Sequence, residues 1–219
     1  HTYWNFAILM TAPFFAYHQI ENIGIPLNAI SAGTSVFAVL SILFYRVWGS
    51  LTDRLGIKSI TVAGICVVAL TPWIWLLMVE GLWPAAMVLE VVNGAVGWAA
   101  VNIVILAFPM EAGRRDSPAY FALYFALGGL GGLLGSVVGG YAAEAFHGLD
   151  LYIGAYRVYG LQLFLMAGSI LRLLAIPLFL RVETAKYVSL PTVALNVIAL
   201  VARRSPLRPF ENSRPLSRR

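Results

Sequence analysis

The chain has 219 residues, of which 60% are apolar and only 11% are charged, and its mean hydropathy is +0.80. A soluble domain carries about 25% charged residues and a disordered chain has low hydrophobicity, so the composition excludes both classes. The formal charge of +5 does not indicate nucleic-acid binding, because most basic residues lie in short connectors and in the C-terminal tail. A bilayer core of roughly 30 Å takes about 20 apolar helical residues per crossing. The sequence therefore predicts an all-α polytopic membrane protein.

Six apolar segments each have about the length that one membrane crossing needs. Each should be a helix, because lipid offers the backbone no hydrogen-bond partner, and the runs are continuous rather than alternating as in a β-barrel. In chain order the predicted spans are Tyr3–Gln19, Ala29–Tyr45, Ser59–Val79, Trp83–Phe108, Ala119–Ala143 and Tyr156–Leu180.

The connectors between these spans predict the orientation. Those after the second and fourth spans hold five basic residues, and the opposite short connectors hold only Arg157. By the positive-inside rule the basic side is cytoplasmic. We expect an integral protein of the bacterial inner (plasma) membrane, with both ends of this chain in the cytoplasm. The five basic residues are Arg46, Arg54, Lys58, Arg114 and Arg115.

Two regions follow from the spans: a six-helix bundle over residues 1–182 and a basic cytoplasmic tail over residues 183–219. Within the tail, Tyr187–Ala202 is apolar but short for a crossing and contains Pro191. We expect it to form an interfacial helix at the membrane surface.

A hairpin motif lies between the second and third spans. The segment Gly49–Ser59 fits the spacing G-x-x-x-D-R-x-G-x-K. Gly49 would let the second span approach a neighbour closely, and Gly56 can adopt a backbone conformation closed to other residues. Asp53 is an anion for a helix N-terminus or for an arginine partner, with Arg114 and Arg115 as candidates. Arg54 and Lys58 would hold the hairpin in the cytoplasm.

This hairpin resembles the cytoplasmic loop motif of the major facilitator superfamily, although the family often has a second basic residue where this chain has Ser59. The resemblance implies that the loop latches two halves of a transporter in the outward-facing state. Segments 12–17, 71–75, 93–102 and 135–141 resemble the seventh, ninth, tenth and eleventh helices of the family. The resemblance thus implies helices seven to twelve and a missing N-terminal six-helix half. The register of helices one to six is the alternative, because the motif occurs in both halves.

The fifth span carries glycines every three or four residues, at Gly128, Gly131, Gly135 and Gly139. Glycine is costly inside a helix, so this stripe needs an explanation. It predicts a face for close helix packing, and a sliding seam used during transport is a compatible reading.

Polar residues at membrane depth are candidate functional residues. Glu90 lies seven residues past Trp83, about 10 Å below the outer end of the fourth span, and Asn93 follows one turn deeper. The family resemblance places this helix on the central cavity, so both are candidates for substrate contact and Glu90 for proton binding. Trp98 and Asn102 on the same span are weaker candidates, with helix packing as the alternative.

Three further polar residues lie near span ends. His18 and Gln19 close the first span as pH-sensing or polar gate residues, or as interfacial anchors. Arg172 lies about 12 Å from the inner end of the sixth span. We expect its side chain to extend toward the headgroups.

Enzymatic function is not expected. The chain lacks the phosphate-binding pattern G-x-x-x-x-G-K-[ST], its three histidines are scattered, and Cys66 stands alone, so neither a cofactor nor a metal is predicted. We predict an alternating-access secondary transporter, proton-coupled through Glu90, for an unidentified small solute. A non-transporting membrane sensor or assembly module on the same fold is the alternative.

Overall fold

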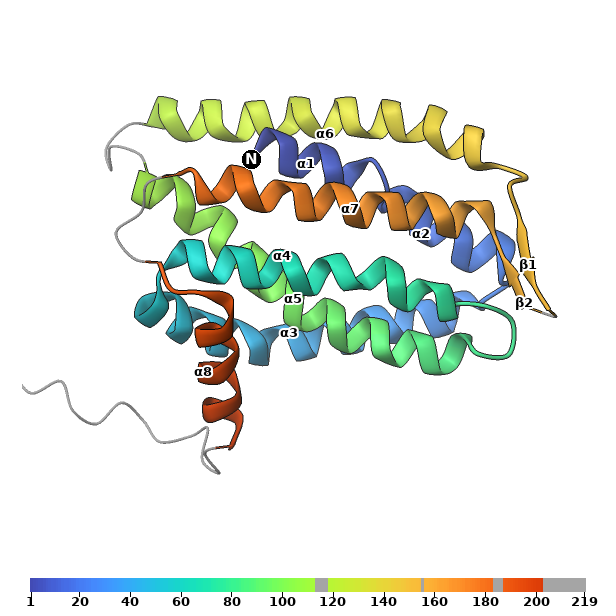
Figure 1. The fold of residues 1–219 in the computed structure, drawn as a ribbon, viewed down its shortest axis with the longest axis horizontal. Coiled ribbons are helices and arrows are strands. Elements are labelled where there is room, and N and C mark those ends of the chain that lie inside the picture. The colour runs from blue at the N-terminus through green and yellow to red at the C-terminus, as the bar shows by residue number, and fades with distance from the viewer. Residues whose placement is uncertain (113–117, 155, 183–186, 203–219) are drawn as a thin grey trace, which may run out of the picture.

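A computed structural model describes residues 1–112, 118–154, 156–182 and 187–202. Helices dominate these residues and run roughly parallel along one long axis, except for the last helix, which lies across them (Figure 1). The elements are α1 (Thr2–Leu9), α2 (Ala12–Tyr17), the π-helix η1 (His18–Asn22), α3 (Leu27–Leu55), α4 (Ile57–Ile74), the 3₁₀ turn η2 (Trp75–Leu77), α5 (Trp83–Ala112), α6 (Pro118–Phe146), β1 (Leu151–Ile153), β2 (Tyr156–Val158), α7 (Gly160–Leu180) and α8 (Leu190–Ala202).

Five of these helices, α3 to α7 in chain order, are long and apolar enough to cross a membrane. The all-α polytopic prediction is therefore confirmed. The first predicted span differs, because it forms α1, α2 and η1 rather than one continuous helix. Pro13 has no backbone N–H to donate to the carbonyl of Leu9, which breaks the helix there. The hydroxyl of Ser136 on α6 lies 3.5 Å from that carbonyl and donates to it.

The sixth predicted span also begins later than expected. Residues from Tyr156 form strand β2, which pairs antiparallel with β1 so that Tyr152 faces Arg157. Gly154 makes the turn with a φ of +65°, a conformation that favours glycine. The helix starts only at Gly160, where the Tyr159 and Gln162 pair forms a capping box.

The long helices pack in a pattern that repeats. α4 packs against α5 and α7, α3 packs against α5, and α1 packs against α6 and α7. The first three predicted spans contain α1, α3 and α4, and the last three contain α5, α6 and α7, so α1 corresponds to α5, α3 to α6 and α4 to α7. Under this correspondence the α1–α6 contact matches the α5–α3 contact, and the α1–α7 contact matches the α5–α4 contact. The α4–α7 contact maps onto itself. The bundle therefore has the contact pattern of two related three-span repeats.

The α1–α6 contact depends on the glycine stripe of α6. A Cβ at Gly131, Gly135 or Gly139 would overlap the backbone carbonyl of Thr2, Phe6 or Met10, respectively. A Cβ at Gly128 would overlap the His1 ring. The stripe thus brings two helix backbones into direct contact, as small residues do between membrane helices.

Candidate functional site

Glu90 is half-buried on α5, and its carboxylate makes no hydrogen bond or ion pair with another described residue. It lies beside the Gly94 position: a Cβ there would lie 3.9 Å from Oε1 of Glu90 and 3.3 Å from the Phe37 ring of α3. A carboxylate in an apolar setting without a partner carries a desolvation cost that nothing nearby repays. This side chain can take up a proton or a cationic group.

Asn93 is engaged by the neighbouring helix. Its amide nitrogen donates to the carbonyl of Val67 at 3.1 Å and to the hydroxyl of Thr71 at 3.0 Å, both on α4. Both of its N–H groups are therefore used to join α5 to α4. Its side-chain oxygen has no partner among the described residues.

The two remaining α5 candidates also touch other helices. Asn102 is exposed, and its amide donates to the Tyr45 hydroxyl of α3 at 3.1 Å. Trp98 is half-buried, and its ring centre lies 6.4 Å from that of Trp4 on α1. Of the three candidates on α5 with a carboxylate or amide side chain, only Glu90 makes no hydrogen bond or ion pair in the described part of the chain.

The hairpin motif joins α3 to α4 through a single residue, Gly56, with a φ of +88°. Asp53 is exposed in the last turn of α3, so it does not sit at a helix N-terminus as one alternative expected. An anion there opposes the helix dipole. Arg54 is exposed beside it, whereas Arg114 and Arg115 lie outside the described residues. Gly49 makes no close approach, since no described atom lies within 4 Å of a Cβ built there.

Lys58 and Ser59, the last residues of this motif, contact the end of α7 and the segment after it. The Lys58 ammonium donates to the carbonyl of Leu180 at 3.1 Å and lies 5.8 Å from the Tyr187 ring centre. Ser59 is buried, and its hydroxyl accepts the Val188 N–H at 2.8 Å. In the family that this hairpin motif resembles, the position of Ser59 often carries a second basic residue. Here Ser59 instead contacts the segment after α7.

Helix α8 continues this contact. Val193, 2% exposed, belongs to the apolar cluster around Trp48 and Leu51 at this end of the bundle. On another face of α8, Leu195 and Ile198 are more than 60% exposed. α8, which lies across the long helices (Figure 1), therefore packs on the bundle with one apolar face and leaves a second one open.

At the opposite end of the bundle His18 is fully buried, and Gln19 beside it is 8% exposed. The Nε2 of His18 lies 3.1 Å from the Met78 carbonyl, and its Nδ1 lies 2.9 Å from the Asn22 amide nitrogen. A carbonyl only accepts, so Nε2 carries the hydrogen and Nδ1 accepts from Asn22, which assigns the neutral ring. His18 thus joins the end of the first predicted span to the segment after α4.

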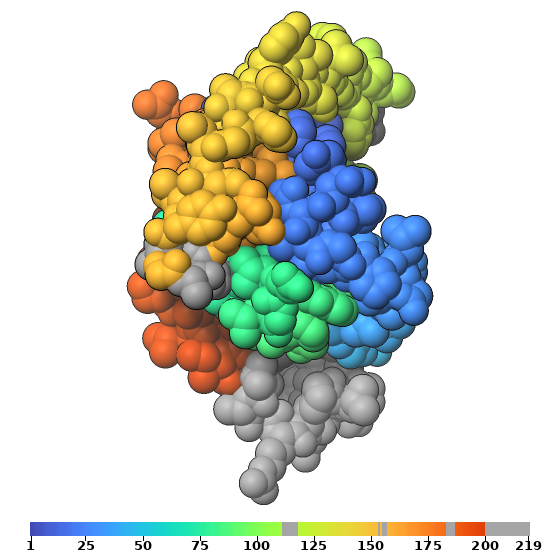
Figure 2. All heavy atoms as spheres, turned by 90° about the vertical axis from the view of Figure 1, so that its right-hand side faces the viewer, coloured from blue at the N-terminus to red at the C-terminus, as the bar shows by residue number. Residues whose placement is uncertain are grey.

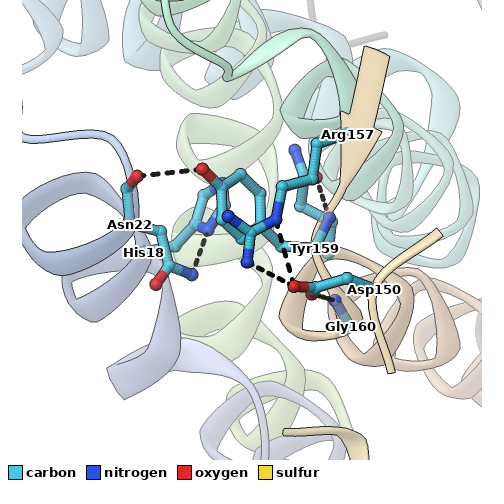
Figure 3. A network of polar contacts seen from close by, with 7 residues as sticks. His18, Asn22, Asp150, Arg157, Tyr159 and Gly160 are labelled. Carbon is cyan, nitrogen blue, oxygen red and sulfur yellow. Dashed lines mark hydrogen bonds and ion pairs between the residues drawn. The ribbon is translucent and has the colours of Figure 1, made fainter. Parts of the chain in front are cut away.

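A polar network next to His18 ties the β1–β2 hairpin to α7 (Figure 3). Arg157 donates to one oxygen of Asp150 through two nitrogens, and the other oxygen accepts the Gly160 N–H at 3.0 Å. The Arg157 guanidinium also lies 4.5 Å from the Tyr159 ring centre. The hydrogen bonds from Arg157, and then the one from Gly160, lower the pKa of Asp150. The Tyr159 hydroxyl donates to the Asn22 carbonyl at 3.2 Å, which closes the network on η1.

Arg172 does not extend toward the headgroups, so that expectation is wrong. It is 2% exposed and points into the bundle, where it donates to the Thr11 hydroxyl at 2.9 Å and the Val68 carbonyl at 3.3 Å. Phe15 lies 5.6 Å below its guanidinium. No carboxylate among the described residues pairs with it. Its hydroxyl partner Thr11 stands at the break between α1 and α2, so this break places an acceptor where the cation needs one.

The sequence profile of the Major Facilitator Superfamily matches residues 3–216. The chain belongs to this superfamily. Comparison with curated proteins and with solved structures found no match. The resemblance inferred from the hairpin motif is therefore confirmed, and the protein is an integral membrane transporter of the major facilitator type.

Sequence reasoning missed several residues of this superfamily member that make contacts at one or the other end of the bundle. From the sequence, Asp150 and Arg157 are placed in a connector and Tyr159 in the sixth predicted span, although the alternation of apolar and polar residues around Gly154 is a hairpin signal. The spacing of Tyr159 and Gln162 resembles a capping box only if tyrosine is accepted as the cap. Nothing in the sequence signals the Ser59–Val188 contact, which joins residues far apart in the chain.

Proposed function

We propose that this protein is a proton-coupled secondary transporter of a small solute, and that residues 1–182 form one of its two six-helix halves. The observation that carries the proposal is Glu90, a half-buried carboxylate with no partner among the described residues of a major facilitator protein. Such a group can bind a proton or a substrate cation and release it when the environment changes.

The contacts on α5 narrow the candidates for substrate and proton binding. Both N–H groups of Asn93 are engaged by α4, which supports a packing role for that residue. Asn102 and Tyr45 form an exposed hydrogen-bonded pair on α5 and α3, and this pair is our second candidate for the cavity wall. In alternating access the site lies near the bilayer midplane between two repeats. We infer that the wall facing Glu90 comes from the other half.

Two features of the hairpin motif support its role as a latch. Asp53 opposes the dipole at the end of α3, a cost of roughly 0.3–1 kcal/mol that a neighbouring cation would reverse. The Arg114–Arg115 pair and the other half are the possible sources of that cation. The open surface over Gly49 is where we expect a helix of the other half to approach closely.

The proposal includes the orientation of the bundle in the membrane and the position of α8. The end of α3, the start of α4 and the end of α7 lie together at the end of the bundle that carries α8 (Figure 1). We place this end in the cytoplasm and α8 in the headgroup region, with Leu195 and Ile198 toward lipid.

The test is uptake by the full-length protein in proteoliposomes. A panel of radiolabelled sugars, amino acids and organic ions is offered with and without an inward proton gradient. We expect the gradient to accelerate uptake of one class, and Glu90→Gln to remove that acceleration at least tenfold, because the amide cannot carry the proton. Glu80→Gln, in the exposed connector before α5, is the matched control. A Glu90→Gln variant that keeps full acceleration would rule out Glu90 as the coupling site, and absence of any uptake would favour a sensor or assembly module.

A further inference from the structure

A pocket of about 380 Å³ lies at the hairpin end of the bundle, apart from Glu90 and the cytoplasmic motif. Its walls come from α2, the C-terminal end of α6, the β1–β2 hairpin and the start of α7. Figure 2 faces this end, where the blue N-terminal segments, the yellow end of α6 and the orange hairpin meet. The volume falls within the range of about 300–1,000 Å³ that small-molecule sites occupy.

The walls of this pocket are fixed by close contacts. The polar network of Figure 3 ties the hairpin to α7 and η1. A Cβ at Gly160 would overlap the Phe146 carbonyl, so the end of α6 and the start of α7 touch through their backbones. Gly148 makes the turn between them with a φ of +81°. A site built this way is shaped before a ligand arrives, which lowers the cost of binding.

The charges that line the pocket do not balance. Asp150 and Arg157 neutralise each other through their ion pair. Glu144 is exposed on the last turn of α6, and its carboxylate has no partner among the described residues. The described lining therefore holds one carboxylate beyond the Asp150–Arg157 ion pair.

The aromatic lining complements that charge. The Tyr17 ring is 49% exposed, and Phe14 also contributes to the wall. The face of an aromatic ring attracts a cation, and a carboxylate adds a charge-assisted hydrogen bond to an ammonium group. The Tyr159 ring in the same wall already stacks on a cation of the protein, the Arg157 guanidinium.

From this lining we infer that the pocket binds a small organic ammonium ion with an apolar body, with Glu144 as counter-ion and Tyr17 against the ligand. This inference goes beyond the proposed transport function, because the pocket lies apart from Glu90. The ammonium group has two possible sources, a free amine and the headgroup of phosphatidylethanolamine.

The experiment uses the full-length protein in nanodiscs of phosphatidylglycerol, with 2-phenylethylammonium as the probe and calorimetry as the readout. We expect saturable binding, and at least tenfold weaker binding of the neutral analogue 2-phenylethanol. Glu144→Gln should weaken probe binding at least tenfold and Tyr17→Leu severalfold, whereas the matched control Glu21→Gln, exposed at the same end outside the pocket, should leave it unchanged.

Equal binding of the probe to wild type and Glu144→Gln, or equal affinity for 2-phenylethanol, would overturn the inference. Both carboxylates are exposed, and unchanged thermal unfolding of each variant checks that it folds. Adding phosphatidylethanolamine to the nanodiscs distinguishes the sources: a fall in probe affinity identifies the headgroup, and an unchanged affinity identifies a free amine. The measurement needs no proton gradient, so its failure is independent of the uptake test.

Discussion

Arg172 shows how a single side chain can depend on the break in the first span. Its guanidinium is buried without a carboxylate among the described residues, and its Nε has no partner there. Removing one partner of a buried charged group costs more than the hydrogen bond itself, because the charge stays buried.

We therefore expect Thr11→Val, which keeps the side-chain shape but removes the hydroxyl acceptor, to lower the free energy of unfolding by about 1–3 kcal/mol. Thermal or denaturant unfolding of the purified protein in detergent measures the change. Thr34→Val is the control, since the Thr34 hydroxyl is exposed and bonds only within its own helix, to Ile30. Equal losses in the two variants would show that the Arg172 contact contributes no more than an ordinary helix-surface hydroxyl.

Because Asp150 holds the β1–β2 hairpin, we expect the stability of this hairpin to depend on pH. Its pKa is lowered in the folded state by Arg157 and Gly160, so the ionised form binds the hairpin better than the protonated form does. The stabilisation is then fully present above the ordinary pKa of about 3.9 and is lost as the pH falls through the lowered folded value. Hydrogen exchange of residues 150–160, corrected for intrinsic rates, should show reduced protection in acid. Asp150→Asn should be poorly protected at neutral pH already, and a wild-type hairpin equally protected at both pH values would contradict this.

At the scale of elements, the glycine stripe of α6 can be tested by substitution, and another glycine of the same helix serves as the control. Gly139→Ala places a methyl group on the Met10 carbonyl, and two helix backbones would have to separate to admit it. We expect a destabilisation of about 1–3 kcal/mol, typical of overpacking. Gly129→Ala in the same helix meets open space, and should be neutral or stabilising by up to about 1 kcal/mol because alanine is the better helix former. Unfolding of the two variants side by side measures the difference, and equal stability would place the α1–α6 contact elsewhere.

Elements were predictable from the sequence where one physical signal dominated. Apolar run length placed the five long helices, and the turn at Gly56 followed from the hairpin motif. The break at Pro13 in the first predicted span could not be seen in its hydropathy, which stays high on both sides of the break. The proline itself is nevertheless a helix-breaking signal. The direction of Arg172 could not be read from its depth in the span, since depth does not say which face of α7 meets the broken segment.

At the scale of the whole molecule, the contact pattern of the bundle explains which faces remain open. The helices pack in the order α3, α5, α4, α7, α1, α6, so α3 and α6 are the outermost. Both expose apolar side chains, such as Val39, Leu43, Leu133 and Val137. Lipid can cover such faces, but the exposed Asn102–Tyr45 pair and the half-buried Glu90 lie on or beside α3. Polar groups at membrane depth favour contact with protein or a water-filled cavity over contact with lipid.

We predict that the described bundle does not transport by itself. Alternating access needs a second bundle that closes the cavity first on one side and then on the other. Proteoliposomes that hold only these 219 residues should show uptake at the rate of empty vesicles, for the solute that the full-length protein carries. With residues 1–182 proposed as one of two halves, adding the other six-helix half as a separate chain should restore uptake. Gradient-driven uptake by the 219 residues alone would instead mean that copies of this bundle pair with each other and that the second half is this chain itself.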